Sequence, residues 1–279
     1  MGKYIPYAGS NAIQEAVIGI KFQETISPTD LSNARMVWNT DLKNDFSRSE
    51  DIIGSQIHIK RTDQGGIQVE GNDPFHSSGF QLLSMGPDGK PSQILQISEN
   101  HFTLHFMEYF GWQETLKRSF RYISAVLPRL NLEKNGIQSF NLRYVDRFTF
   151  DGQTNEANAV LLFQEPSEFI SSKCFDVGPY WHCHSGWFDN QFADSRILNQ
   201  LNIQSRMIDG AATVTIDHNM IFHLRSLFNS VRVFMESAGG KNSSLKESLD
   251  HLHNVNHDVI SGLLCPNMAE RIGIFNESS

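Results

Sequence analysis

The amino-acid sequence predicts an α+β fold made of two fused antiparallel halves, each a sheet packed against helices. Two observations support this prediction. Apolar and polar residues alternate over short stretches separated by glycine and proline, which is typical of antiparallel strands joined by turns. Other stretches repeat their apolar residues every three or four positions, which is typical of helices that cover a sheet. Both kinds of stretch occur in each half of the chain.

The first half begins with a strand expected over residues 13–22, where every second residue is apolar. Ser27 suits the N-cap position and is followed by proline, so a helix is expected from there to about Phe46. Residues 52–107 contain glycine and proline at short intervals, which predicts an antiparallel meander. Apolar residues at steps of three and four predict a second amphipathic helix over residues 112–127, which Pro128 is placed to end.

The second half is expected to begin with another long strand and to end with a helix. The dipeptide Asp209-Gly210 predicts a hairpin turn. Apolar residues at steps of three and four predict helices over residues 221–235 and 245–264. Shorter stretches of alternating residues predict strands over residues 140–150, 160–163, 180–188, 200–207 and 212–216.

The two halves, residues 1–133 and 134–279, therefore share an order of strand, meander and closing helix, and we expect them to pack as one body. This order resembles a helix-grip fold or one half of a TATA-binding-protein-like pseudo-repeat, in which a curved antiparallel sheet wraps a long helix. The repeat is one of topology, since the second half has no long helix predicted after its first strand.

The charge balance of the chain bears on its partners. The 279 residues contain 23 Lys and Arg against 31 Asp and Glu, a net charge of −8. Proteins that bind the phosphate backbone of nucleic acids usually carry a basic surface, so this balance argues against such a partner for the chain as a whole. The sequence has no apolar run long enough for a transmembrane helix and no secretory signal pattern, and its three cysteines lack paired spacing. We expect a cytoplasmic protein without a membrane partner.

Two arginines of the mid-chain strand are the first candidate ligand site. Arg143 and Arg147 lie on the face of the strand opposite to Leu142, Tyr144 and Phe148. Guanidinium groups at this spacing suit a phosphate or carboxylate, because each offers a rigid bidentate fork. The alternative is a ladder in which both arginines pair with acidic residues of the neighbouring strands.

Four histidines form two pairs with the spacing of metal ligands. His253 and His257 are expected on one face of the last helix, as in helices that bind zinc. His182 and His184 are expected on one face of a strand. If the helix packs on that sheet, the four imidazoles converge, and zinc or manganese is the expected metal. The alternative is structural: a helix-edge pair hydrogen-bonded to a strand, and a polar outer face above buried aromatic residues.

The helix expected over residues 112–127 has a basic side formed by Lys117, Arg118 and Arg121. Aromatic residues lie nearby, so one interpretation of this side is a nucleic-acid contact, in which the basic residues bind the phosphate backbone and the aromatic rings stack on bases. An ordinary solvated helix face is the other. The sequence has no phosphate-binding glycine loop, dinucleotide fingerprint or nucleophile elbow, so no catalytic residue is assigned.

Three segments resemble a sporadically distributed bacterial family of uncharacterised proteins. The opening strand, residues 13–22, is similar to the one with which its members begin. Residues 142–148 are similar to its mid-chain strand, in which Asn is more usual than Asp at position 146. Residues 249–257 are similar to its last helix, with matches at Leu252, His253 and His257.

The patchy occurrence of that family implies genes that travel horizontally, as genes of phage defence do. The absence of catalytic motifs, the many aromatic residues and this patchy distribution together favour a non-catalytic recognition or accessory protein that partners another protein in a bacterial phage-defence or conflict system. Two other classes stay open: a metal-dependent hydrolase or nuclease that uses the four histidines, and a nucleic-acid-binding module that uses the basic helix or a concave sheet. No cofactor is expected beyond zinc or manganese in the second class, and self-association stays open.

Overall fold

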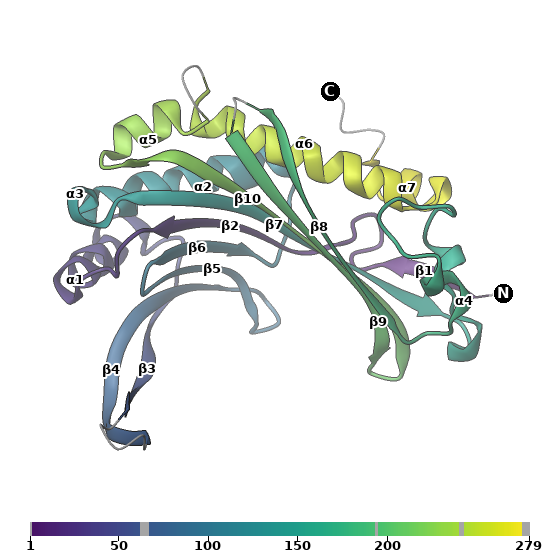
Figure 1. Cartoon of the computed structure of the whole chain (residues 1–279), viewed down its shortest axis with the longest axis horizontal. Coiled ribbons are helices and arrows are strands. Elements are labelled where there is room, and N and C mark those ends of the chain that lie inside the picture. The colour runs from purple at the N-terminus through teal and green to yellow at the C-terminus, as the bar shows by residue number, and fades with distance from the viewer. Residues whose placement is uncertain (1, 62–66, 193–194, 240–242, 275–279) are drawn as a thin grey trace.

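The computed structural model describes residues 2–61, 67–192, 195–239 and 243–274 (Figure 1). These residues form one ten-stranded antiparallel sheet with the order β3-β4-β5-β6-β2-β7-β10-β9-β8, and β1 pairs with the far end of β7. The strands are β1 (Lys3–Pro6), β2 (Ile13–Phe22), β3 (Arg48–Arg61), β4 (Ile67–Met85), β5 (Pro91–Ser98), β6 (His101–Phe106), β7 (Ile137–Asp151), β8 (Trp181–Phe192), β9 (Ser195–Ile208) and β10 (Ala211–Phe228).

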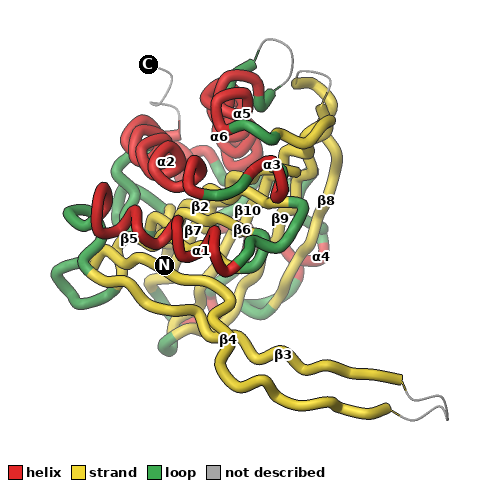
Figure 2. Tube along the Cα trace, turned by 90° about the vertical axis from the view of Figure 1, so that its left-hand side faces the viewer, coloured by secondary structure: helices red, strands yellow, loops and turns green. Residues whose placement is uncertain are grey.

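The helices gather on one face of this sheet (Figures 1 and 2). Two of them are long, and α6 follows the length of the sheet beside α2. The opposite face is free of helices among the described residues, because every long helix packs its buried residues into the cores of the first face. The helices are α1 (Pro28–Val37), α2 (Trp112–Val126), α3 (Leu132–Asn135), α4 (Lys173–Asp176), α5 (Val231–Ser237), α6 (Leu245–Leu263) and α7 (Pro266–Arg271).

Strand alternation builds the core. In β2, Ile18 and Ile20 point to the helix face and are buried. In β7, Phe140 and Leu142 point to the same face and are also buried. These residues pack against α1, α2, α5 and the first half of α6 in one hydrophobic cluster. A second cluster lies under the last turns of α6 and includes Phe148. The two clusters bury the apolar alternation on which the strand predictions depend.

The local signals at helix ends are confirmed. The Ser27 hydroxyl accepts a hydrogen bond from the Asp30 backbone N–H at the start of α1, which continues into a π-helical turn, Trp38–Leu42. Ser244 caps α6 through a reciprocal capping box with Glu247. Pro128 lies in the 3₁₀ turn that follows α2.

The α+β class is confirmed, and the two halves share one continuous sheet. Strand β2 pairs with β6 of its own half and with β7 of the other half. Strand β7 pairs in turn with β10 of its own half. The first half therefore reads β2, α1, β3 to β6, α2, and the second reads β7, short helices, β8 to β10, α6. The two predicted halves are fused through their central strands, which hydrogen-bond to each other in one sheet.

Two element predictions are wrong. The helix predicted over residues 221–235 begins only at Val231, since Ile221 and Phe222 continue the ladder of β10 with β7 and β9. Phe222 is fully buried and stacks on Phe140, with ring centroids 4.8 Å apart. This packing stabilises the strand, although the spacing of the apolar residues fits a helix. The strand predicted over residues 160–163 is a 3₁₀ turn followed by a single bridge from Phe163 to Leu264.

The sheet is arched, and its helix-free face forms the underside of the arch (Figure 1). At one end, the β3–β4 hairpin extends beyond the body of the molecule on the side away from the helices (Figure 2). At the other end, β9 and β10 join through the turn at Asp209 and Gly210, which both have positive φ as the hairpin prediction requires. Among the described residues, no helix combines the length and apolar composition that crossing a membrane requires.

Candidate functional sites

The first candidate site is a pocket on the helix-free face, at the centre of the sheet. We call it the arginine pocket; it has a volume of about 470 Å³. Arg143 donates two hydrogen bonds of 2.7 Å to the carboxylate of Asp217 on the neighbouring strand β10. This bidentate contact raises the pKa of Arg143. The pocket is lined by Gln14, Glu15, Met107, Arg143, Val145, Arg147, Gln204, Arg206, Ile208, Thr215 and Asp217.

The other acidic residue of the pocket is also engaged. The carboxylate of Glu15 lies 2.7 Å from Nδ1 of His105 on β6, and this hydrogen bond lowers the pKa of Glu15. Glu15 and Asp217 therefore both have a partner on an adjacent strand. Arg143 is paired with an acidic residue, as the predicted ladder of charges requires, but Arg147 is not.

Arg147 and Arg206 are the arginines of this pocket that lack an acidic partner. The Nε of Arg147 is buried and makes no hydrogen bond, and neither guanidinium forms an ion pair within the described part of the chain. Strand register places Arg147 opposite Thr215, which in turn lies opposite Gln204, and Arg206 is two residues further along β9. Both cations thus face the same pocket, and the buried Nε of Arg147 has no acceptor within the described residues.

The four histidines do not converge. His218 and Asn256 are hydrogen-bonded between β10 and α6, and Trp187 of β8 stacks against His218, so Trp187 lies on the helix face. Strand alternation then places His182 and His184 on the opposite face, where their ring centroids are 5.6 Å apart. The described residues contain no group of three or more His, Cys, Asp or Glu side chains that would hold a metal ion. The sheet separates these two histidines from the pair on α6.

The basic side of α2 is matched by acidic residues. Arg118 and Lys117 both contact Glu114, at 2.8 and 3.9 Å. Arg121 donates two hydrogen bonds to Asp45, and the Arg118 guanidinium lies over the ring of Phe110. These contacts correspond to the solvated-face interpretation of Lys117, Arg118 and Arg121, because their charges are balanced within the molecule.

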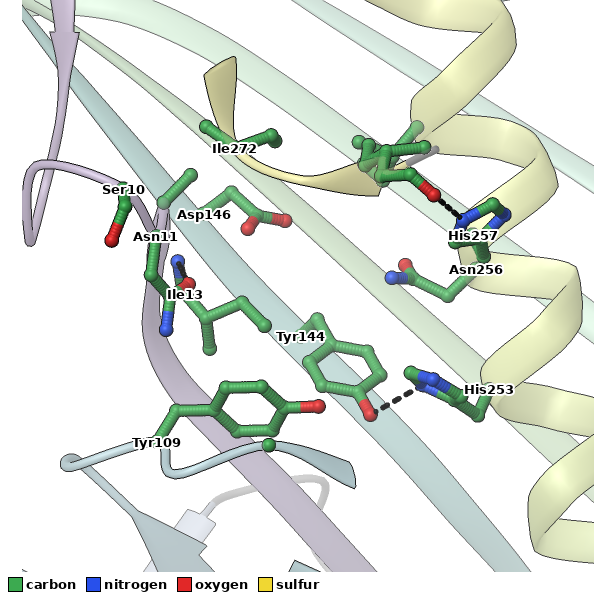
Figure 3. Close-up of a pocket in the computed structure, with 14 residues that line it drawn as sticks. Ser10, Asn11, Ile13, Tyr109, Tyr144, Asp146, His253, Asn256, His257 and Ile272 are labelled. Carbon is green, nitrogen blue, oxygen red and sulfur yellow. Dashed lines mark hydrogen bonds between the residues drawn. The ribbon is translucent and has the colours of Figure 1, made fainter. Parts of the chain in front are cut away.

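The second candidate site is a cavity of about 180 Å³ on the helix face, which we call the Asp146 cavity (Figure 3). It lies between β7, the first turns of the chain after β1, and α6. The Asp146 side chain points into it and is 3% exposed. The lining residues are Ser10, Asn11, Ala12, Ile13, Tyr109, Gly111, Tyr144, Asp146, His253, Asn256, His257, Ile260, Ile272 and Ile274.

The α6 side of this cavity is fixed by hydrogen bonds. The Tyr144 hydroxyl lies 3.0 Å from Nδ1 of His253, whose ring stacks on Trp112 with centroids 4.6 Å apart. His257 bonds through Nε2 to the backbone carbonyl of Ile274. Burial lowers the pKa of His253 to about 4, so its imidazole is neutral at neutral pH. The pair predicted as metal ligands is thus held by a strand and by the chain after α7, as the structural alternative expects.

All three segments that carry the family resemblance contribute to the Asp146 cavity. Ile13 comes from the opening strand, Tyr144 and Asp146 from the mid-chain strand, and His253 and His257 from the last helix. Segments distant in sequence therefore meet at one place.

Asp146 was not among the site residues predicted from the sequence, although the sequence contains a signal for it. Leu142, Tyr144 and Phe148 define the buried register of β7, and position 146 falls in that register. A carboxylate at an apolar position of a central strand is costly unless it has a partner. An acidic residue that interrupts a buried alternation is the pattern that would have found this cavity.

No family model matches the chain, and no curated protein matches it.

Proposed function

We propose that this protein is a non-catalytic recognition protein that binds an acidic segment of a partner protein on the helix-free face of its sheet. The arginine pocket receives a carboxylate of that segment. Arg147 carries this proposal, because its Nε is buried within the molecule and makes no hydrogen bond there. A buried donor without a partner destabilises a protein, so its presence is explained when a ligand supplies the acceptor.

The charge within the pocket favours an anion. Arg143 is matched by Asp217, and Glu15 is hydrogen-bonded to His105. Arg147 and Arg206 remain as cations without an acidic partner in the described residues. A carboxylate that contacts both guanidinium groups forms charge-assisted hydrogen bonds, which are about twice as strong as bonds between neutral groups.

A protein partner is favoured over nucleic acid by the charge of the whole molecule. The net charge of −8 repels a long polyanion, whereas a short acidic segment meets mainly the local charge of the pocket. Amide side chains continue the polar surface across β7, β10 and β9, where Asn141 donates to Asn219 and Asn219 donates to Gln200. Such groups suit hydrogen bonds to the main chain and side chains of a bound segment.

The biological setting of this role is proposed from the family resemblance. We place the protein in the cytoplasm of a bacterium, as an accessory component of a phage-defence or conflict system. Its partner is then another protein encoded in the same gene neighbourhood. The acidic-segment proposal does not depend on this setting and is tested separately.

The test is the binding of a fluorescein-labelled peptide rich in Glu and Asp, measured by anisotropy. We expect Arg147→Met and Arg206→Met each to weaken binding about tenfold, the effect of losing one charge-assisted hydrogen bond. Arg232→Met is the matched control, because Arg232 is exposed on α5 and pairs with Glu236. Equal affinity of the wild type and Arg147→Met would contradict the proposal.

A labelled single-stranded DNA of the same length separates the nucleic-acid alternative. Tighter binding of DNA than of the acidic peptide, with a steep dependence on salt, would favour that alternative. In the native host, a photo-crosslinking residue at Gln204 should capture one protein, and Arg147→Met should abolish the capture. A crosslinker at Met36, which is 57% exposed on α1, is the control for surface collisions.

A further inference from the structure

We propose that the Asp146 cavity binds a small organic cation, a molecule with an ammonium or guanidinium group attached to a short apolar or aromatic body. The Asp146 carboxylate pairs with the cationic group, and the walls of the cavity hold the body. This site lies on the helix face, so it is independent of the proposed function on the opposite face.

The first argument is the state of Asp146. Its side chain lies on the helix face of the sheet, lines the cavity and is 3% exposed. It forms no hydrogen bond or ion pair with any residue that the structure describes. Burial alone raises the pKa of this carboxyl from 3.8 to about 7. A buried carboxylate is normally paired, so this one lacks the partner that its position requires.

The second argument is the charge of the cavity. None of the lining residues is Lys or Arg. The titratable groups that face Asp146 are Tyr109, Tyr144 and, on α6, His253 and His257. Burial lowers the pKa of His253, and His257 is bonded to the backbone carbonyl of Ile274. The protein therefore supplies an acid to this cavity without a matching Lys or Arg, and the missing cation comes from a ligand.

The third argument is the shape and lining of the cavity. A volume of about 180 Å³ is far more than one water molecule needs. The rings of Tyr109 and Tyr144 meet edge to face, with centroids 6.1 Å apart, and form one wall. Ile13 and Ile272 flank Asp146 in Figure 3. A cavity that combines apolar and aromatic side chains with the carboxyl of Asp146 suits an amine that carries a small hydrophobic body.

Asn256 supplies a second polar contact. Its Oδ1 lies at a hydrogen-bond distance of 2.9 Å from Nδ1 of His218. This bond orients the amide so that its N–H groups are left for the cavity, into which the side chain points (Figure 3). A ligand with an acceptor beside its cationic group, such as a hydroxyl or carbonyl oxygen, meets both Asp146 and Asn256. The cavity thus selects for an amine or guanidine and has a donor for a neighbouring oxygen.

The test is titration of the full chain with benzylamine and n-butylamine, with benzyl alcohol as a neutral match for the first. We expect both amines to bind at millimolar concentrations and to raise the melting temperature, and benzyl alcohol to bind at least about tenfold more weakly. Calorimetry at about pH 6 in two buffers of different ionisation enthalpy should show proton release, because pairing with a cation deprotonates Asp146.

Asp146→Asn should abolish both the preference for amines and the proton release. Asp151→Asn is the matched control, because Asp151 is exposed near the end of the same strand. The melting temperature of each variant without ligand shows that it is folded. Failure of both amines to bind, equal binding of benzyl alcohol, or amine binding that survives Asp146→Asn would each overturn the proposal. None of these results bears on the peptide-binding test of the arginine pocket.

Discussion

His218 on β10 is hydrogen-bonded to Asn256 on α6, with 2.9 Å between Nδ1 and Oδ1. His218 is fully buried, and Nε2 lies 3.2 Å from Asn199 of β9 on its other side. One side chain therefore connects two strands to the longest helix. Truncation of either partner leaves a polar group buried without its bond.

We expect Asn256→Ala to lower the free energy of unfolding by about 1–3 kcal/mol, the range for a buried donor left without an acceptor. Asn254→Ala is the matched control, because Asn254 is exposed on the same helix. Urea denaturation of both variants measures the difference. A loss that is equal in the two variants would show that helix propensity, and not the bond to His218, determines the effect.

His218 also predicts a dependence of stability on acid. Burial lowers its pKa from 6.5 to about 4. The unfolded chain binds this proton at higher pH than the folded chain does, so stability is lost as pH falls from about 6.5 to 4. The contribution of this residue is at most about 3 kcal/mol. His218→Gln should flatten the curve of unfolding free energy against pH in that window, and an unchanged slope would contradict the assignment.

Asp146 acts in the opposite direction. Its pKa is raised to about 7 in the folded chain, so the folded chain keeps a proton that the unfolded chain releases near pH 3.8. Stability is therefore lost as pH rises from about 4 to 7. Asp146→Asn should raise the free energy of unfolding at pH 8, by at most about 4 kcal/mol, and change it little at pH 3.5. Thermal unfolding at both pH values, without added amine, checks this.

Arg147 and Arg143 should differ in their effects on folding. Arg143→Met breaks the bidentate pair with Asp217 and should destabilise the chain by about 1–2 kcal/mol. Arg147→Met removes a buried Nε that has no hydrogen bond and should leave stability unchanged or raise it. Chemical denaturation compares the two. A large loss in Arg147→Met would mean that this arginine serves the fold.

Gly79 of β4 predicts a steric effect. A Cβ at this position would lie 2.0 Å from the backbone oxygen of Ile97 on β5, which cannot move without disturbing the ladder. Gly79→Ala should destabilise the chain by more than about 2 kcal/mol. Gly178→Ala is the control, because nothing lies within 4 Å of its added Cβ. The midpoint of thermal unfolding distinguishes them.

Signals that act over one turn or one strand were sufficient for most of the fold. The strand over residues 13–22 and the cap at Ser27 are where alternation and capping chemistry predict them. The helix predicted over residues 221–235 is wrong for most of its length. The spacing of Ile221, Leu224 and Phe228 fits a helix, whereas the burial of Phe222 against Phe140 favours the sheet. Local patterns do not contain that tertiary contact.

The candidate sites were predicted less completely, for a related reason. Alternation placed Arg143 and Arg147 on one face, but only strand register shows that Asp217 satisfies the first. The histidine pairs were found by their spacing, yet the sheet separates them. Asp146 is a site residue because β7, α6 and the chain after α7 line one cavity around it, and this tertiary arrangement is not contained in the local sequence pattern.

The pairing of β2 with β7 has a consequence for the integrity of the molecule. A chain cut between residues 133 and 134 would expose the backbone N–H and C=O groups of both central strands, which are long and apolar on one side. Fragments of this kind are templates for intermolecular pairing, so each half expressed alone should aggregate. The intact protein is expected to melt in a single cooperative transition, since neither half can release the other without opening the middle of its own sheet.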